Sequence, residues 1–550
     1  MKYFLHFIFF SVCLFSSTSY AQTLESYTSF GGETNDWPHS LIKDTFGNIY
    51  VVGQFSDTVH FNSIDTIYEN VVDSTNLAPG LEMETRDAFL AKYNSDMSLL
   101  WIIPLGLSGY DIASEILLDD SLNIYIMGVG EGEIDFDPSN NTQILNGGPL
   151  SIHERFIIKY DNNGNFIKGN RIHGNGINVY DNHFFKDDLG SIYAYGGDSI
   201  TKLNTNLDIQ WSNKIGGYPE IINQSEIQCI RSFQMSNYHL QTNKLVLERY
   251  NVLTGDLIDT TLYGHTEGMF RSGFIRKANN GDLIIYGDYW GNAQIYGGGN
   301  IVEMIYDYSE VTQNPPTMFN FVSRFSNSGE LIWAKAYDNK GPNPNEIITD
   351  DSGNIYLVGY LFDYANFDPV NEIIHTTSQG ASYIAKYDSD FNYLAMSQFL
   401  GTVSGVHDIK IYEDTLLMCG WFNNPADLDI DLGTTTVTSN GLTDGFVAKY
   451  SNFDVTGDPV SVGEHDVDNV YFTTYVNASK KTIEINVNEA FSLEGIKTVE
   501  IYSLKGQLLY SEQTHLNVLE LNTSRFQNTA YVIRVSCKDW SATEKIITIN

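Results

Sequence analysis

Short apolar runs recur along the chain, and Gly, Asn or Asp bounds most of them. The runs are rich in Ile, Val, Tyr and Phe, which favour the pleated surface of a β-strand, whereas Gly and Asn supply tight turns. One kind of run ends in a basic residue and an aromatic or apolar one, as in residues 89–93 and 446–450. It occurs seven times, and successive basic residues are 43 to 75 positions apart: Lys92, Lys159, Lys202, Arg249, Arg324, Lys386 and Lys449. Repetition on this scale predicts stacked structural units.

Three further features accompany this run. After the first six copies a turn and a second apolar strand follow, which predicts a β-hairpin. That strand carries Trp101, Trp211 and Trp333, each nine residues after its basic residue, and we expect these side chains to pack in the core or between units. A Gly-terminated apolar run such as residues 47–53 precedes most hairpins and is interpreted as the inner strand. Eight residues beyond that Gly, five copies carry an apolar residue with polar neighbours, which we expect to point inward: Phe61, Phe136, Ile295, Phe367 and Leu428.

About four strands in about 60 residues correspond to one blade of a β-propeller. The seventh hairpin lacks its second strand, and residues 27–32 resemble the strand at residues 101–106. We therefore expect the N-terminal strand to pair beside residues 446–450 and to close a ring, which removes an exposed edge. The predicted fold class is all-β: a seven-bladed β-propeller over residues 22–456, followed by a small C-terminal immunoglobulin-like β-sandwich over residues 462–550.

The motifs resemble two known families. The recurring Asp-x-x-Gly-Asn-Ile-Tyr-x-x-Gly, the Asp-Phe-Asp-Pro at residues 135–138 and the Ala-Lys-Tyr hairpin resemble the β-propeller repeats of large secreted Bacteroidetes proteins. The last 90 or so residues resemble the type A sorting domain of the type IX secretion system, at residues 496–502, 505–509, 531–535 and 545–550. This second resemblance implies export by the type IX machinery. The chain has Ala478 and Ala530 where that family usually has Pro and Gly.

The N-terminus predicts passage through the inner membrane. Lys2 is followed by an apolar run at residues 4–15 and by a small-x-small site, the pattern of a signal peptide over residues 1–21 with cleavage between Ala21 and Gln22. No later segment has the length of a transmembrane helix. We therefore expect a protein that is secreted or held on the outer cell surface after transit through the periplasm.

Charge and cysteine content narrow the set of partners. The formal net charge of −37 argues against a nucleic-acid partner, whose binding needs a basic surface. The acidity has two interpretations, general solubility or cation binding. Three cysteines follow the signal peptide, Cys229, Cys419 and Cys537, and they are expected to be buried free thiols because they are odd in number and far apart.

Candidate chemistry is sparse. The sequence contains no nucleophile elbow, zinc-protease helix motif, phosphate loop or Cys-x-x-Cys pair, so we predict no catalytic residues and no cofactor. The weak metal candidates are Asp427, Asp429 and Asp431, which could hold Ca²⁺ from one strand face. The alternative is that these residues are solvated or form a signature of the blade edge, because Asp135, Asp137 and Asp368 occupy equivalent places.

Two functions remain open at this point. The first is a non-catalytic propeller that binds an extracellular protein or glycan as an adhesion scaffold. The second is an extracellular hydrolase or lyase that uses the central pocket of the propeller, and a quinone-dependent dehydrogenase is a more distant third. An enzyme should carry irregular charged residues on its inner strands, and the inner strands inferred above carry mostly Ile, Tyr, Val and Gly. The sequence therefore favours the binding protein over the enzyme.

Overall fold

The computed structural model describes two stretches of the chain. They are residues 23–451, without 57, 62–66, 70–85, 107–109, 133, 138–149, 173–181, 198, 216, 232–243, 279, 306–318, 338–341, 343, 362–363, 369–373, 377–380, 400, 414 and 430–434, and residues 472–547, without 478–481, 488–496, 504–507, 517, 523–529 and 538–539. All regular elements within these residues are β-strands, as predicted. The described part of the chain contains no helix with the length and apolarity to span a membrane.

Between residues 23 and 451, the described strands build seven antiparallel four-stranded units, here numbered sheets 1 to 7. Sheet 1 contains β2 (Trp37–Lys43), β3 (Ile49–Phe55), β6 (Asp87–Tyr93) and β7 (Leu99–Leu105). Sheet 2 contains β8 (Ile112–Leu118), β9 (Ile124–Gly132), β10 (Leu150–Tyr160) and β11 (Phe166–Ile172). Sheet 3 contains β12 (His183–Lys186), β13 (Ile192–Gly196), β14 (Ser199–Leu203) and β15 (Ile209–Lys214). Sheets 4 and 5 contain β16 (Tyr218–Asn223), β17 (Glu226–Arg231), β18 (Lys244–Asn251) and β19 (Leu257–Thr266); and β20 (Met269–Lys277), β21 (Leu283–Trp290), β24 (Phe319–Phe325) and β25 (Leu331–Ala336). Sheets 6 and 7 contain β26 (Pro344–Thr349), β27 (Ile355–Leu361), β30 (Ala381–Tyr387) and β31 (Tyr393–Gln398); and β32 (Gly401–Tyr412), β33 (Thr415–Asp427), β35 (Asp444–Ser451) and β1 (Thr23–Gly32).

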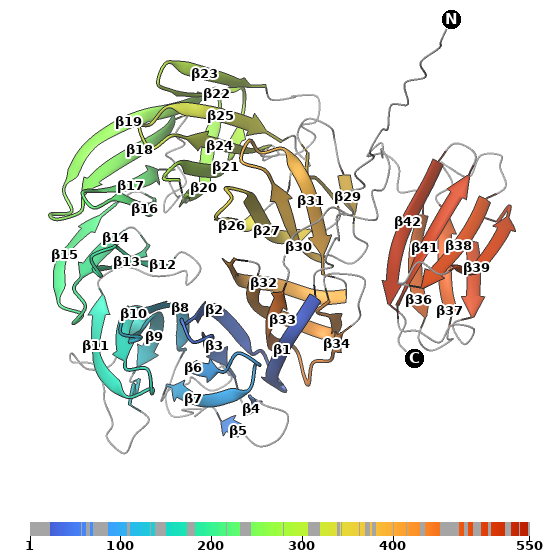
Figure 1. Cartoon of the computed structure of the whole chain (residues 1–550), viewed down its shortest axis with the longest axis horizontal. Helices are drawn as coiled ribbons and strands as arrows, with labels where there is room; N and C mark the ends of the chain where they lie inside the picture. Colours follow the sequence, from blue (N-terminus) through green and yellow to red (C-terminus); the bar gives the residue numbers. More distant parts are fainter. Residues whose placement is uncertain are drawn as a thin grey trace, which may run out of the picture.

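These units are arranged around a common axis (Figure 1). The first strand of each unit, from β2 to β32, lies nearest the axis, and the fourth strand lies on the outer side. Every one of the predicted basic-aromatic runs is the third strand of its unit: β6, β10, β14, β18, β24, β30 and β35. The Gly-terminated run is the second strand: it is buried, as predicted, but its placement as the inner strand is wrong.

The N-terminal strand joins the last unit. β1 pairs antiparallel with β35, with Tyr27 opposite Ala448 and Ser29 opposite Phe446. The predicted pairing is therefore confirmed. Phe30 of this strand is 2% exposed, and its ring stacks on Phe61 at 4.9 Å. The first and last units are joined by this strand, and its apolar side chain is part of the buried core between them.

Neighbouring units pack through apolar cores and are joined by the repeated basic residues. One cluster combines Tyr50 and Leu90 of sheet 1 with Ile124 and Ile158 of sheet 2, and comparable clusters join later neighbours. The Lys92 ammonium donates a 3.1 Å hydrogen bond to the Asn162 carbonyl, in the hairpin turn of the next sheet. Lys159, Lys202 and Arg324 make the equivalent bond.

The tryptophan side chains join the same contacts. The indole N–H of Trp211 donates to the Val252 carbonyl and that of Trp333 to the Ser389 carbonyl, each in the following sheet. The prediction that these tryptophans pack between units is confirmed. The repeated Asp-x-x-Gly-Asn motif is a turn: Asp44 Oδ1 accepts hydrogen bonds from the backbone amides of Phe46 and Asn48. Asp161 forms the same turn with Asn163 and Asn165.

Short hairpins extend some sheets at their outer side. The hairpin β4 (Thr58–His60) and β5 (Ile67–Glu69) lies between β3 and β6 in sequence but pairs with β1 of sheet 7. The hairpin β22 (Ala293–Gly297) and β23 (Asn300–Met304) lies between β21 and β24 but pairs with β19 of sheet 4. The strands β28 (Tyr364–Asn366) and β29 (Ile374–Thr376) pair with each other, and β34 (Thr436–Val437) pairs with β33. All five predicted inward-pointing residues, Phe61, Phe136, Ile295, Phe367 and Leu428, are buried.

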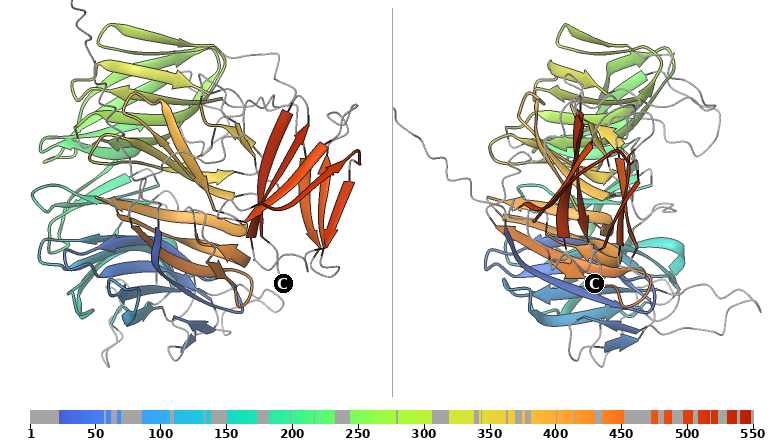
Figure 2. Two further views of the ribbon diagram at one scale, coloured as in Figure 1. Left: turned by 45° about the vertical axis from the view of Figure 1, so that its right-hand side comes forward. Right: turned by 90° about the vertical axis from the view of Figure 1, so that its right-hand side faces the viewer.

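The C-terminal strands form two sheets that share one core (Figure 2). One sheet contains β36 (Phe472–Asn477), β37 (Thr482–Val487) and β40 (Val518–Asn522). The other contains β38 (Lys497–Ser503), β39 (Leu508–Thr514), β41 (Ala530–Cys537) and β42 (Trp540–Ile547). Ile485 and Leu521 of the first sheet pack in one cluster with Ile501 and Ile533 of the second. A separate core of this kind allows independent folding.

Candidate functional site

The innermost strands carry charged residues at equivalent register positions. The first position is defined by strand pairing. Its residue lies opposite a second-strand residue, which in turn lies opposite the third-strand residue two positions before the basic residue of the repeat. This position is occupied by Glu115, Glu346 and Asp408 in sheets 2, 6 and 7. His183 occupies this position in sheet 3 and Ser40 in sheet 1. Two residues further along the inner strand, sheets 4, 5 and 7 carry Glu220, Arg276 and Lys410. Because side chains two apart on a strand share a face, the two positions form adjacent layers.

These residues come together at the axis, and we call them the axial cluster: Glu115, His183, Glu220, Arg276, Glu346, Asp408 and Lys410 (inner strands in Figure 1). Glu115 on β8 is close enough to Asp408, Lys410, Glu346 and Arg276 for all four charges to shift its pKa. Those partners lie on three different strands, β20, β26 and β32. The cluster therefore combines groups from distant parts of the chain.

Two ion pairs hold the cluster together. Arg276 donates two hydrogen bonds to Glu346 Oε1, at 3.0 and 2.8 Å, and so joins the inner strands of sheets 5 and 6. Asp408 Oδ1 accepts a hydrogen bond from Lys410, and Asp408 Oδ2 accepts from the Ser40 hydroxyl at 2.9 Å. This second contact joins sheet 7 to sheet 1. Neither of these two ion pairs includes Glu115 or Glu220.

The two carboxyl groups outside the ion pairs have raised pKa values, and the histidine has a lowered one. Burial, reinforced by Asp408, raises the pKa of Glu115 to about 8. Burial likewise raises the pKa of Glu220 to about 7, although Arg276 acts in the opposite direction. Burial and the neighbouring Arg276 and Lys410 hold the pKa of His183 well below its usual value. At neutral pH Glu115 is therefore mainly protonated and Glu220 is near its titration midpoint, beside two neutralised ion pairs and a neutral imidazole. Such groups can donate or accept a proton.

A second group of aromatic and basic side chains lies where sheets 7 and 1 meet. The rings of His39 and His407 stack at 4.9 Å, and Trp37 stacks on Trp421 at 5.6 Å. His407 Nδ1–H donates to the Pro38 carbonyl, and its Nε2 accepts from the Trp421 indole. Because a carbonyl only accepts and an indole N–H only donates, these bonds fix the neutral tautomer of His407. Burial lowers the pKa of both histidines.

The acidic residues singled out as metal candidates lie apart from the axial cluster. Asp427 is fully buried, and its Oδ1 accepts hydrogen bonds from the backbone amides of Asp429 and Thr435, at 3.0 and 2.8 Å. Tyr450 donates a 2.6 Å hydrogen bond to the Leu428 carbonyl between them. The interpretation of Asp427 as solvated is therefore wrong, and the arrangement is a turn at the blade edge. Asp431 lies outside the described residues, as do Ala21 and Gln22.

The same turn occurs in other sheets. Asp135 Oδ1 accepts from the Asp137 amide, while the hydroxyls of Tyr160 and Tyr387 donate to the carbonyls of Phe136 and Phe367. Among the residues that the structure describes, no group of three His, Cys, Asp or Glu side chains is placed to hold a metal ion. Cys229 and Cys419 are buried free thiols, and burial raises the pKa of each, whereas the side chain of Cys537 lies outside the description.

Comparison with known proteins adds one decisive match, to the end of the chain. Residues 473–550 match the family model of the secretion system C-terminal sorting domain. The chain carries a C-terminal sorting domain. The sorting domain contains all of the strands from β37 to β42 and most of β36, and it implies secretion by the type IX system to the cell surface or the extracellular space. No curated protein matches the chain.

The solved structures that resemble the chain do so only weakly. The WD40 domain of Pan2 from Neurospora crassa is 9% identical, with a TM-score of 0.36, over 79% of this chain and 98% of that one. A quinohemoprotein alcohol dehydrogenase from Pseudomonas putida is 9% identical, with a TM-score of 0.35, over 81% of this chain and 78% of that one. A protein of unknown function from Bacteroides caccae is 10% identical, with a TM-score of 0.28, over 58% and 94% of the two chains. These scores carry no functional argument.

Sequence reasoning missed the axial cluster because it assigned the inner position to the wrong strand. The true inner strands share no motif: the same register position holds Ser40, Glu115, His183, Glu346 and Asp408 in different sheets. The available clue was the short segment that precedes each Gly-terminated run. In every repeat that segment carries at least one charged or histidine residue among apolar ones.

Proposed function

We propose that this protein is a secreted or cell-surface binding protein. In this proposal, residues 22–456 are a seven-bladed β-propeller that binds an extracellular protein or glycan, and residues 462–550 are an immunoglobulin-like export sandwich. The signal peptide at residues 1–21 delivers the chain to the periplasm, and the type IX machinery then recognises the sorting domain. The observation that carries the proposal is the match of residues 473–550 to a sorting domain, together with the closed set of four-stranded units that precedes it.

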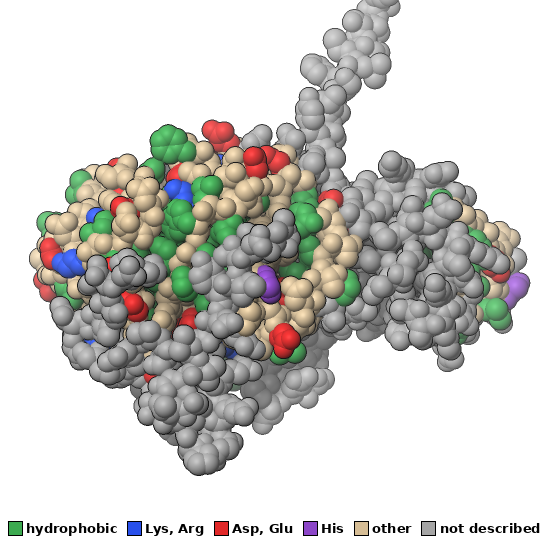
Figure 3. Space-filling view, turned by 90° about the horizontal axis from the view of Figure 1, so that it is seen from below, with side chains coloured by type: hydrophobic (Ala, Val, Ile, Leu, Met, Phe, Trp, Pro, Cys, Tyr) green, Lys and Arg blue, Asp and Glu red, His purple; other side chains and the backbone are tan. Residues whose placement is uncertain are grey.

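The surface is consistent with a partner other than nucleic acid or an anionic membrane. On the face shown in Figure 3, the described Lys and Arg side chains are few and scattered, and the whole chain has a formal net charge of −37. Polyanions need a concentrated basic surface. A protein or an uncharged glycan has no such requirement.

The experiment that tests this function uses the mature full-length chain, residues 22–550. It is applied to a glycan array and to a pull-down from the extracellular fraction of the producing culture. Saturable binding of a glycan or protein supports the proposal. A chain that is exported and folded but binds neither class argues against it.

One observation favours a second candidate function, an extracellular hydrolase or lyase. Glu115 and Glu220 are carboxyl groups with pKa values of about 8 and about 7, as a general acid requires near neutral pH. The chemistry would take place at the axis. Release of reducing or unsaturated ends from polysaccharides, lost in Glu115→Gln, would favour this candidate over a binding protein.

A further inference from the structure

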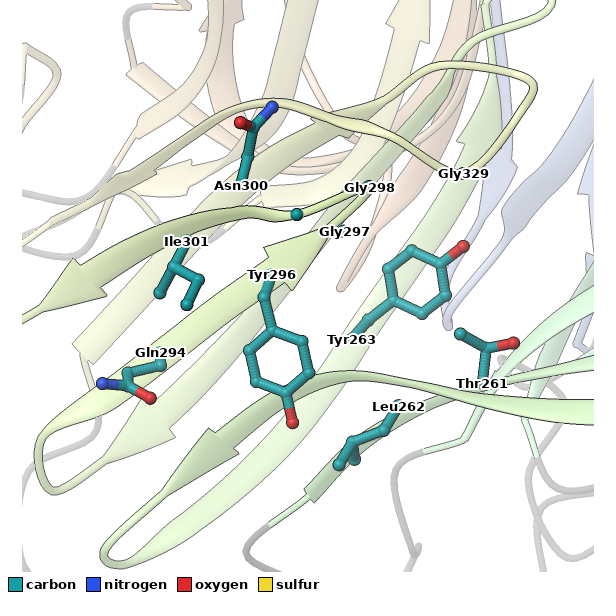
Figure 4. Close-up of a pocket in the computed structure, with 11 residues that line it drawn as sticks. Thr261, Leu262, Tyr263, Gln294, Tyr296, Gly297, Gly298, Asn300, Ile301 and Gly329 are labelled. Carbon is teal, nitrogen blue, oxygen red and sulfur yellow. The ribbon is translucent and has the colours of Figure 1, made fainter.

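A pocket of about 440 Å³ opens on the outer side of sheet 4, away from the axial cluster (Figure 4). Its walls are β19, the hairpin β22–β23 and the turn that contains Gly329, between β24 and β25. The volume lies within the range of about 300–1,000 Å³ that small-ligand sites occupy. The pocket thus joins parts of sheets 4 and 5.

The pocket forms where β19 and β22 diverge and stop pairing. β22 pairs with β19 from Ala293 opposite Thr266 to Ile295 opposite Gly264. The next residues on each strand, Tyr263 and Tyr296, both line the pocket. Tyr263 is also the extra residue at an irregularity in the pairing between β18 and β19. A bulge of this kind re-aims a side chain, and here it directs Tyr263 to the pocket.

The hairpin wall is held at its turn. Its turn contains Gly298 and Gly299 with φ angles of 61° and 92°, as a two-residue hairpin turn of the I′ type requires. The Asn300 amide nitrogen donates a 3.0 Å hydrogen bond to the Leu331 carbonyl of sheet 5. The opening between the hairpin and β19 is therefore formed by the fold before any ligand binds.

The lining is free of charge although the chain is strongly acidic. All lining residues are neutral: Thr261, Leu262, Tyr263, Gln294, Tyr296, Gly297, Gly298, Gly299, Asn300, Ile301 and Gly329. The chain has 99 charged residues out of 550, but none of them lines this pocket. A neutral ligand is therefore favoured over an ionic one. An ionised group would enter without a counter-charge from the lining and would pay the cost of desolvation.

The neutral groups combine an aromatic surface with hydrogen-bonding atoms. Tyr263 is buried, and its ring is fixed edge-on against Phe325 at 4.6 Å. Tyr296 is partly exposed and lies between β22 and β19 in the pocket (Figure 4). Gln294 donates to Glu303 through its amide nitrogen, which orients the amide group and leaves its carbonyl oxygen as an acceptor. Asn300 lies on the opposite face of the hairpin, where its bond to the Leu331 carbonyl holds the hairpin against sheet 5.

We propose that this pocket binds a neutral oligosaccharide, with one sugar ring against Tyr296 and its hydroxyls hydrogen-bonded by Gln294. A sugar offers an apolar C–H face and several neutral hydroxyls, which match an aromatic ring bordered by an amide. The proposal rests on the proposed function and names the ligand class for one site.

The test compares binding by the mature full-length chain and three variants. Tyr296→Ala removes the aromatic surface, and Ile301→Lys adds a charge at a lining residue that is 63% exposed, so this second change should not disturb folding. Ile258→Ala is the control, because Ile258 lies on β19, one of the strands that form the pocket wall, is 45% exposed and does not itself line the pocket. An array of neutral and acidic glycans identifies the ligand, and calorimetry measures its Kd.

We expect neutral glycans to bind, with Kd raised about tenfold or more in Tyr296→Ala and Ile301→Lys and unchanged in Ile258→Ala. Neutral-glycan binding that survives both pocket variants, or binding of acidic glycans or proteins alone, overturns the pocket assignment and leaves the proposed function intact. Binding of no glycan and no protein contradicts the proposed function itself.

Discussion

Replacing Glu115 by Gln should change how stability depends on pH, because this carboxyl group is held in its protonated form at the axis. Below pH 4.5 the group is protonated in both the folded and the unfolded chain. As pH rises from 4.5 to 8, the unfolded chain loses this proton first, so the folded wild type loses stability over that interval. Gln cannot ionise, so the variant should escape this loss.

The size of the effect follows from the pKa difference. A rise from 4.5 to about 8, at about 1.4 kcal/mol for each unit, sets a ceiling of about 5 kcal/mol. Glu115 keeps partial exposure to solvent, which weakens the effect of burial on its pKa. We therefore expect about 2 kcal/mol, so that from pH 5 to pH 8.5 the free energy of unfolding of Glu115→Gln should rise by that amount relative to wild type.

Urea unfolding followed by tryptophan fluorescence measures this difference at pH 5, 6.5 and 8.5. Glu330→Gln is the matched control, since Glu330 lies exposed on the turn before the outer strand β25, whereas the axial cluster lies on the inner strands. We expect the control to follow the wild type at every pH. If Glu115→Gln also follows the wild type, the burial and electrostatic environment assigned to the axis are wrong.

Three further predictions concern other parts of the ring. His39 stacks on His407 beside Arg86, and burial lowers the pKa of both histidines. Their stabilising contribution is therefore present above pH 6.5 and is lost as pH falls below that value, so the melting temperature of the wild type should decline between pH 7 and pH 5. His39→Asn should make this decline smaller. Phe30→Ala should lower the free energy of unfolding by about 3 kcal/mol or more, measured in urea, because it empties a buried site between two aromatic rings; a smaller loss than 1 kcal/mol would show that β1 contributes little to closure. Ca²⁺ should leave the melting temperature within about a degree of its value in chelator, because Asp427 is engaged by backbone amides, and a rise of several degrees would identify the acidic turns as metal sites.

The repeat could be predicted from the sequence because its motifs carry local roles that recur. In four sheets the basic residue of the third strand reaches the hairpin turn of the next sheet, so Lys92, Lys159, Lys202 and Arg324 make the same contact. The pairing of β1 with β35 followed from the likeness of residues 27–32 to an outer strand. Both inferences depended on side chains that do the same thing in several sheets.

The axial cluster and the outer pocket could not be predicted in the same way. Side chains at the axis meet groups from other sheets, so Glu115 can differ from Ser40 and His183 without disturbing its own sheet. The pocket depends on which strand the hairpin β22–β23 joins, and it joins β19 of the preceding sheet although the segment lies within sheet 5. Nothing local in the sequence specifies that partner.

Deleting residues 460–550 tests most directly the central claim, that a self-closed propeller is exported by a separate sorting domain. The ring is closed by β1 and β35 without any strand of the sorting domain. In the native host, cell fractionation with circular dichroism of the purified product should find a folded, cooperatively melting protein in the periplasm and almost none on the surface or in the medium. Normal amounts of the truncated protein outside the cell, or a truncated protein that fails to fold, would contradict the account.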